Sequence, residues 1–204
     1  MTDTQPLSNE DFYEIFKAAH ALLEGHFLLA SGLHSPTYLE KFQVLQYPRS
    51  VEALCADMAR RFADQNIEVV LGPTTGGVLL AYEVAKNLGT RGIFAERGEN
   101  DKGRVLRRGF SISPGERVLL VDDILTTGGS VRETMEVVTE FGGNLVGIAV
   151  LADRTNGKID FGVPLEALLK LDVVQYKPDD CPLCAAGVPL TKRGSTPKPQ
   201  ENLK

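Results

Sequence analysis

The sequence predicts an α/β protein with a central, mainly parallel β-sheet flanked by helices. Short apolar, β-branched runs alternate along the chain with longer segments whose apolar residues recur at helical spacing. Glycine and proline steps separate the two kinds of segment. Strands that alternate with helices in this way are typical of parallel sheets covered by helices on both faces.

The N-terminal region opens with a predicted helix over residues 9–24. Ser8 and Asp11 form a capping box at its start, and Gly25 is expected to end it. The stretch 27–47 contains Ser-Gly, Ser-Pro and Tyr-Pro steps. It is therefore expected to turn often and to pair as short strands.

The core elements follow from Pro48. The first four are expected to be a helix over 48–62, a strand over 67–71, a helix from Gly76 to Leu88 and a strand over 91–95. Gly89 suits the C-terminal cap of the second of these helices. Residues 96–103 hold no apolar side chain, which predicts an exposed mobile loop.

The remaining elements are expected to be an edge strand within 105–112, a buried strand over 117–121, a helix over 130–141 and a strand over 144–152. The segment after Pro178 is rich in Pro, Gly, Lys and Ser. It is expected to be disordered beyond about Ser195.

Length and composition narrow the class of protein. The 204 residues are 43% hydrophobic and 24% charged, which is typical of a single globular domain with a proper core. A net charge of -5 without a basic block disfavours a nucleic-acid partner. No apolar run approaches the ~20 residues of a membrane span, so no membrane partner is expected. The N-terminus lacks signal-peptide features and there are three cysteines, which predicts a cytoplasmic protein.

The stretch VLLVDDILTTGGS, residues 118–130, carries the most chemistry. Asp122 and Asp123 are expected at the carboxyl end of a strand, where open parallel sheets bind ligands. Adjacent carboxylates accept hydrogen bonds from a ribose diol or hold a hydrated divalent cation. The next residues offer hydroxyls, glycine N–H groups and a helix N-terminus to an anion: Thr126, Thr127, Gly128, Gly129 and Ser130. The combination predicts a ribose 5-phosphate site, against the alternative of a capped turn without a ligand.

A second strand-to-helix loop has a similar composition. It consists of Thr74, Thr75, Gly76 and Gly77, after the strand that ends at Leu71. Its hydroxyls and glycines suit a second anion such as pyrophosphate, although a tight turn alone also explains them. The loop has no basic residue, so magnesium or Arg and Lys side chains from elsewhere must offset the pyrophosphate charge.

Residues 118–130 resemble the phosphoribosyl pyrophosphate motif of the type I phosphoribosyltransferases. The resemblance implies that family's fold, with a small hood formed by the N-terminal segment. It also implies that Asp122 and Asp123 bind the ribose hydroxyls, that residues 126–130 bind the 5-phosphate, and that residues 74–77 bind pyrophosphate. One domain over 1–204 is expected, with helix and hood in about 1–47, the core in about 48–177 and a tail in about 178–204.

Three segments resemble the orotate phosphoribosyltransferases within that family. Residues 27–38, FLLASGLHSPTY, are similar to the hood segment over orotate, and Asp153-Arg154 follows a strand where the family has an Arg facing the orotate carboxylate. The tail CPLCAAGVPLTKRGS, residues 181–195, is similar to the ending of one bacterial branch. The orotate-binding residues that this implies are Thr126, Arg154, Ser35 and Tyr38.

The resemblance implies transfer of the phosphoribosyl group of phosphoribosyl pyrophosphate (PRPP) to orotate, with release of pyrophosphate. Mg²⁺ is the implied cofactor, bound through PRPP near Asp122 and Asp123 rather than held directly by the protein. Arg97 and Lys102 are the implied catalytic residues of the mobile loop 96–104, in which Arg104 is a further basic candidate. The family's dimers imply a homodimer.

Two other functions fit the same motif. The first is phosphoribosyl transfer to a purine or to another pyrimidine. The second is a regulator that binds PRPP and a nucleic acid without catalysis. Such a regulator is expected to show a basic face or an added DNA-binding module, and this chain shows neither.

The cysteines and histidines receive plainer interpretations. Cys181 and Cys184 have zinc-like spacing, but no second pair or histidine lies near them in the sequence. A complete metal site would then need a partner chain, which favours a structural or incidental pair. His26 is expected at the surface, and His34 is expected in the hood, near the substrate.

Overall fold

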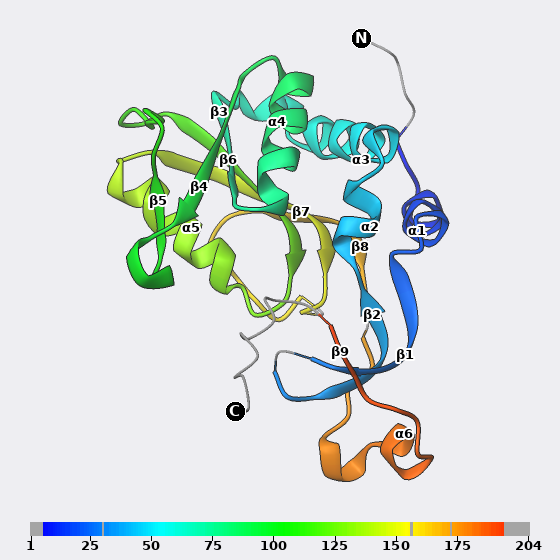
Figure 1. Cartoon of the computed structure of the whole chain (residues 1–204). Coiled ribbons are helices and arrows are strands. Elements are labelled where there is room, and N and C mark those ends of the chain that lie inside the picture. The colour runs from blue at the N-terminus through cyan, green and yellow to red at the C-terminus, as the bar shows by residue number, and fades with distance from the viewer. Residues whose placement is uncertain (1–5, 30, 156, 172, 194–204) are drawn as a thin grey trace, which may run out of the picture. The chain divides into compact units, whose positions relative to one another are not determined.

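The structure, a computed structural model, describes residues 6–29, 31–155, 157–171 and 173–193 (Figure 1). The chain forms two compact units. The larger comprises Met1–His20 and Lys41–Asp172, and the smaller comprises Ala21–Glu40 and Val173–Lys204. The smaller unit is therefore built from two segments that lie far apart in the sequence.

The larger unit contains a six-stranded sheet with the strand order β5-β4-β3-β6-β7-β8. Its strands are β3 (Val69–Pro73), β4 (Arg91–Arg97), β5 (Arg104–Leu106), β6 (Arg117–Leu125), β7 (Asn144–Asp153) and β8 (Leu165–Lys170). All neighbours pair in parallel except β5, which runs antiparallel to β4 at the edge. The predicted fold class, a mainly parallel sheet with helices around it, is confirmed.

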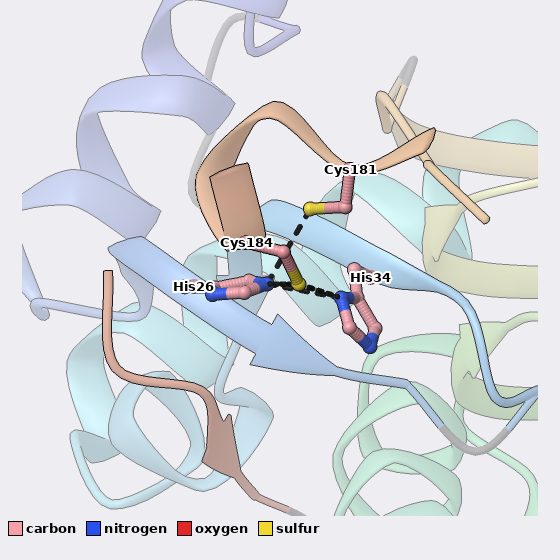
Figure 2. Close-up of side chains that lie close together, drawn as sticks. All are labelled: His26, His34, Cys181 and Cys184. Atoms are coloured by element: carbon pink, nitrogen blue, oxygen red, sulfur yellow. Dashed lines mark hydrogen bonds between the residues drawn. The ribbon is translucent and has the colours of Figure 1, made fainter. Parts of the chain in front are cut away.

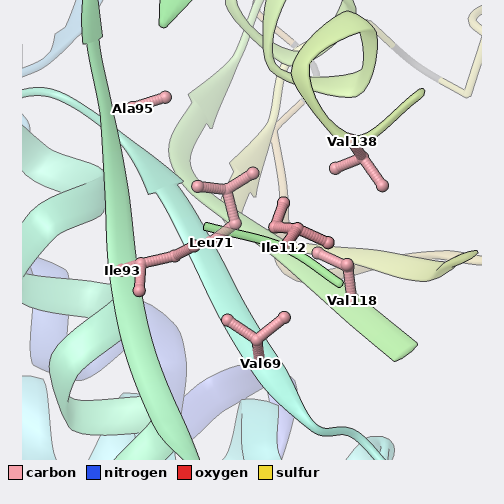
Figure 3. Packing of buried hydrophobic residues seen from close by; sticks show 7 residues of the cluster. All are labelled: Val69, Leu71, Ile93, Ala95, Ile112, Val118 and Val138. Carbon is pink, nitrogen blue, oxygen red and sulfur yellow. The ribbon is translucent and has the colours of Figure 1, made fainter. Parts of the chain in front are cut away.

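Helices cover both faces of this sheet. The helices of the larger unit are α1 (Asn9–Ala18), α2 (Lys41–Leu45), α3 (Pro48–Arg61), α4 (Gly76–Leu88) and α5 (Gly129–Glu140). On β4, a Cβ at Gly92 would press on the backbone of α4, whereas Ile93 packs in a cluster with Val138 of α5 (Figure 3). Because successive strand residues point to opposite faces, α4 and α5 lie on opposite sides of the sheet.

The smaller unit contains a three-stranded sheet with the order β2-β1-β9. Strands β1 (Leu22–Leu28) and β2 (His34–Leu39) pair antiparallel, and β9 (Thr191–Lys192) adds in parallel to β1. The short helix α6 (Pro182–Ala185) lies in the C-terminal segment. The pairing of short strands predicted for 27–47 is confirmed for β2, whereas its partner β1 begins earlier, at Leu22, and residues 41–45 form a helix instead. The C-terminal segment supplies the third strand.

Several predicted boundaries were wrong. Helix α1 ends at Ala18 rather than at residue 24, because His20 leaves the helical conformation and Leu22–Leu28 pair as a strand. Strand β4 continues to Arg97, inside the predicted mobile loop. Helix α2 and strand β8 were not predicted, since five and six residues are too few for a clear period. The disorder predicted beyond Ser195 lies outside the described residues.

The burial of His26 also differs from the prediction. His26 was expected at the surface and is 2% exposed, and His34 is 5% exposed. Strand β1 has an irregular register between Glu24 and Phe27, where two residues face one on β2. Such a bulge redirects side chains, which explains why the consecutive residues His26 and Phe27 are both buried. Among the described residues, no helix is long and apolar enough to cross a membrane.

Candidate active site

The polar residues predicted to bind a ligand gather at the carboxyl ends of β3 and β6. These strands are parallel neighbours, with Leu71 opposite Leu120, so the segments that follow them meet at one edge of the sheet. We call Thr74–Gly77 the first loop and Thr126–Ser130 the second loop. Asp122 and Asp123 lie near the carboxyl end of β6. This strand continues to Leu125 instead of ending at residue 121 as predicted.

The first loop packs directly on the acidic pair. A Cβ on Gly76 would collide with the carboxylate of Asp123, and a Cβ on Gly72 would collide with the backbone of Gly77. Glycine is therefore needed for β3, the first loop and β6 to approach this closely. The Thr74–Thr75 peptide bond is cis, and Thr75 is exposed at the start of α4.

The acidic pair is buried and carries one strong cationic partner. Asp122 is 6% and Asp123 is 4% exposed. The Lys41 ammonium lies 2.9 Å from Oδ1 and 2.7 Å from Oδ2 of Asp123. Burial, followed by repulsion from Asp123, raises the pKa of Asp122 to about 7, and the charge of Lys41 opposes this rise. Lys41 contacts only Asp123, so one ammonium group faces two buried carboxyl groups. A further cation near Asp122 and Asp123 would therefore be electrostatically favourable.

The second loop joins β6 to α5. Gly128 has a φ of 78°, which glycine adopts readily, and α5 begins at Gly129. A Cβ on Gly128 would press on the Phe161 ring. Thr126, Thr127 and Gly129 are exposed, so the free N–H groups at the start of α5 are open to an anion.

Arg104 connects the two loops. Its guanidinium donates to the carbonyl oxygen and the hydroxyl of Thr74 at 3.1 and 3.0 Å, and to the Ser130 hydroxyl at 3.2 Å. The Nε atom lies 3.4 Å from a Glu133 oxygen. Its side chain is 3% exposed, and burial lowers the pKa of its guanidinium below the usual value. One buried, planar cation therefore links the first loop to the second.

Of the four residues expected to be catalytic, Asp122 and Asp123 are buried, whereas Arg97 and Lys102 are exposed. Arg97 ends β4, has a side chain that is 49% exposed, and pairs with Glu133 at 2.9 Å. Lys102 is exposed in the short connection between β4 and β5. Arg104 was the third basic candidate in the same segment. The structure places its guanidinium between the first and second loops.

The residues implied in orotate binding fall in both units. Thr126 and Arg154 directly follow the paired residues Leu125 and Asp153, which end the adjacent strands β6 and β7 of the larger unit. The Arg154 N–H donates to the Leu125 carbonyl at 2.9 Å. Ser35 and Tyr38 lie on β2 of the smaller unit. The Ser35 hydroxyl donates to the Thr37 carbonyl at 2.8 Å, and the Tyr38 ring packs on Phe27.

Lys41 is the site residue that the sequence reasoning missed. It opens α2, a helix too short to be predicted, and contacts Asp123 from 82 residues away in the chain. The sequence carries no local signal for this pairing. Two adjacent buried carboxylates do indicate that a cationic side chain lies nearby. The sequence does not indicate which of its lysines and arginines is that partner.

Comparison with known proteins gives a consistent answer. The model of the phosphoribosyl transferase domain family matches residues 43–161. The chain is 52% identical to the orotate phosphoribosyltransferase of Caldicellulosiruptor bescii over 93% of its own length and 100% of the relative's. It is 53% identical to that of Pelotomaculum thermopropionicum, over 93% and 98% of the two chains. The crystal structure of orotate phosphoribosyltransferase from Aeropyrum pernix matches with a TM-score of 0.66 at 27% identity, over 78% of this chain and 92% of the other.

Proposed function

The chain belongs to the phosphoribosyl transferase domain family, among the orotate phosphoribosyltransferases, and we propose from this a role for each of its site residues. The reaction moves the 5-phosphoribosyl group of PRPP to orotate, giving orotidine 5'-monophosphate and pyrophosphate in pyrimidine biosynthesis. The new bond forms between orotate N1 and ribose C1, and the bond from C1 to pyrophosphate breaks. The whole chain acts as one phosphoribosyltransferase domain, with the smaller unit as its hood.

The donor occupies the carboxyl ends of β3 and β6. Asp122 and Asp123 accept hydrogen bonds from the ribose hydroxyls. The second loop and the N-terminus of α5 bind the 5-phosphate, and the first loop binds pyrophosphate. One observation supports this assignment. The first loop packs on Asp123, and Arg104 donates hydrogen bonds to Thr74 of the first loop and Ser130 of the second loop.

The acidic pair also fits the family's divalent cation. Carboxylate oxygens are preferred ligands of Mg²⁺, and Lys41 balances only one of the two buried charges. We propose that Asp122 and Asp123 hold Mg²⁺ through the ribose hydroxyls of PRPP rather than by direct ligation. When bound, the ion neutralises charge on the pyrophosphate leaving group.

The residues that we propose for the acceptor belong to both units. The Arg154 guanidinium pairs with the orotate carboxylate, for which its planar fork is suited, and Thr126 adds a hydroxyl beside it. Ser35 and Tyr38 belong to the hood over the base. Arg97 and Lys102 supply exposed positive charge to the departing pyrophosphate from the segment that joins β4 to β5.

We further propose a cytoplasmic homodimer. Phe42 of α2 and Leu79 and Tyr82 of α4 are 47%, 48% and 72% exposed, and these helices contact each other. Exposed large apolar side chains on two helices in contact with each other are typical of a protein interface. The cysteines are free, as a reducing compartment would keep them. Light scattering is expected to give twice the chain mass, and Tyr82→Glu is expected to shift it toward the monomer.

The direct test is an assay with PRPP, Mg²⁺ and orotate, followed by the loss of orotate absorbance. Adenine, hypoxanthine, xanthine and uracil serve as competing acceptors in parallel. We expect turnover with orotate, and Arg154→Gln is expected to weaken orotate binding while leaving PRPP binding intact. Turnover with another base instead would overturn the acceptor, and donor binding without any turnover would favour a regulator.

A further inference from the structure

Four potential metal ligands meet in the smaller unit, in a place that the proposed function does not use. His26 comes from β1, His34 from the start of β2, Cys181 directly precedes α6 and Cys184 lies within it. Figure 2 shows the two rings and the two sulfur atoms converging on one point. One nitrogen or sulfur atom of each residue lies within 4.8 Å of those of the other three. We call these residues the Cys–His cluster.

Four of the distances within the Cys–His cluster are close to those of a tetrahedral site. His26 Nε2 lies 3.0 Å from His34 Nδ1, 3.5 Å from the Cys181 sulfur and 3.8 Å from the Cys184 sulfur. The Cys184 sulfur lies 3.3 Å from His34 Nδ1. Around a zinc ion with Zn–N of about 2.0–2.1 Å and Zn–S of about 2.3 Å, tetrahedral angles separate two nitrogens by about 3.3 Å and a nitrogen from a sulfur by about 3.6 Å. All four ligand atoms already lie within 4.8 Å of one another, so small side-chain movements are enough to bring them onto one ion.

Hydrogen bonding fixes the His26 ring in the form that a metal needs. Its Nδ1 lies 2.8 Å from the Val188 carbonyl, which only accepts hydrogen bonds, so Nδ1 carries the proton. Nε2 is then unprotonated and points into the cluster. A histidine ligand held by a backbone carbonyl in this way is typical of metal sites.

The same lone pair of His26 Nε2 faces three groups at once. His34 Nδ1 and both sulfur atoms are within reach of it, and a lone pair accepts one hydrogen bond well. A central cation satisfies all four groups together, whereas pairwise hydrogen bonds leave some of these buried polar atoms unmatched. Burial makes that difference costly, because three of the four residues are at most 5% exposed.

The smaller unit also has little else to stabilise it. Its described buried residues are Ala21, Phe27, Leu39, His26, His34, Ser35 and Cys181, of which only the first three are apolar. Small units with few buried apolar side chains are commonly stabilised by a structural metal. Here the ligands replace the missing apolar core and join the C-terminal segment to the sheet.

We propose that His26, His34, Cys181 and Cys184 bind one Zn²⁺ ion in a closed tetrahedral site that fastens the C-terminal segment to strands β1 and β2. Two sulfur and two nitrogen ligands in this arrangement select zinc among the common cellular cations. Binding displaces the two thiol protons, and the four protein ligands leave no open position for a substrate. The earlier expectation that a complete site needs a partner chain is corrected, because one chain brings all four groups together.

The test measures the metal content of the full chain, purified without chelators from zinc-containing medium. About one zinc per chain is expected in the native protein and in the controls Cys55→Ala and His20→Asn. These controls change the third cysteine and the third histidine, neither of which belongs to the Cys–His cluster. Cys184→Ser and His34→Asn are expected to lose the zinc. Equal zinc in these two variants and in the controls would overturn the proposal.

A second measurement covers the case in which the ligand variants fail to fold. The native chain, stripped of zinc, is titrated with Co²⁺, whose visible absorption reports tetrahedral geometry and whose near-ultraviolet bands report thiolate ligation. Saturation at about one Co²⁺ per chain with both features supports the site. A spectrum without thiolate bands, or a native chain that holds a Cys181–Cys184 disulfide and no metal, would contradict it.

Discussion

The site in the larger unit and the Cys–His cluster in the smaller unit are assembled in opposite ways. In the larger unit, Asp122, Asp123 and the second loop are contiguous in sequence, and parallel pairing of β3 with β6 brings the first loop to the same edge. In the smaller unit, the cysteines lie 150 to 158 residues from the histidines that they approach. Chemistry carried by one strand and its turn is readable from a sequence, whereas chemistry made by a distant segment is not.

The largest expected effect tests whether the site in the larger unit and the Cys–His cluster are independent of each other. Asp122→Asn together with Asp123→Asn is expected to lower kcat/KM for PRPP by about a hundredfold or more, because both acceptors proposed for the ribose hydroxyls lose their charge. Zinc content is expected to stay the same, since neither carboxylate belongs to the Cys–His cluster. Steady-state kinetics and metal analysis of one preparation check both statements. Loss of zinc in this variant would show that the two regions are coupled.

Chelation is expected to produce the reverse pattern. Removing zinc from the free protein is expected to speed hydrogen exchange at the amides of β1 and β2, because the cluster ties these strands to the C-terminal segment. The amides of β3 and β6, in the middle of the six-stranded sheet, are expected to keep their protection. Exchange followed by mass spectrometry resolves the two regions. Cys184→Ser is the matched control, in which the chelator is expected to change nothing further.

A smaller effect separates the two kinds of basic residue near the loops. Arg104→Lys keeps the charge but loses the planar fork that reaches Thr74 and Ser130. It is expected to lower kcat/KM for PRPP by about tenfold or more, since a hydrogen bond from a charged group is worth about 1.5–3 kcal/mol. Arg97→Lys is expected to cost less than about fivefold, because an exposed ion pair contributes about 1 kcal/mol or less. Equal losses in the two variants would show that Arg104 acts only through its charge.

The fold and part of the site were predictable because their signals are local. The apolar strand 117–121, the acidic pair and the glycine-rich turn stand together, and their period and composition decide the structure. Lys41 was not predictable, because its helix is five residues long and its partner lies 82 residues away. The burial of His26 was not predictable either, since the bulge in β1 breaks the alternation that assigns strand residues to a face.

The smallest expected effect concerns the pKa of Asp122. Lys41, which the sequence analysis did not identify as a site residue, lowers this pKa. Burial and Asp123 raise the pKa of Asp122 to about 7, and Lys41 opposes them. A carboxylate accepts hydrogen bonds from the ribose hydroxyls better than a protonated carboxyl does. The kcat/KM for PRPP, which reports the free enzyme, is therefore expected to rise as the pH increases through about 7.

Lys41→Gln removes the opposing charge, so the pKa of Asp122 is expected to increase and the rising limb to move to higher pH. Lys41→Arg keeps the charge and is expected to leave the limb near its original position. A profile that shifts equally in both variants would assign Lys41 a packing role, since only the charge differs between them. A profile that shifts in neither would separate Lys41 from the ionisation of Asp122, and burial and the neighbouring Asp123 would then account for the raised pKa of Asp122.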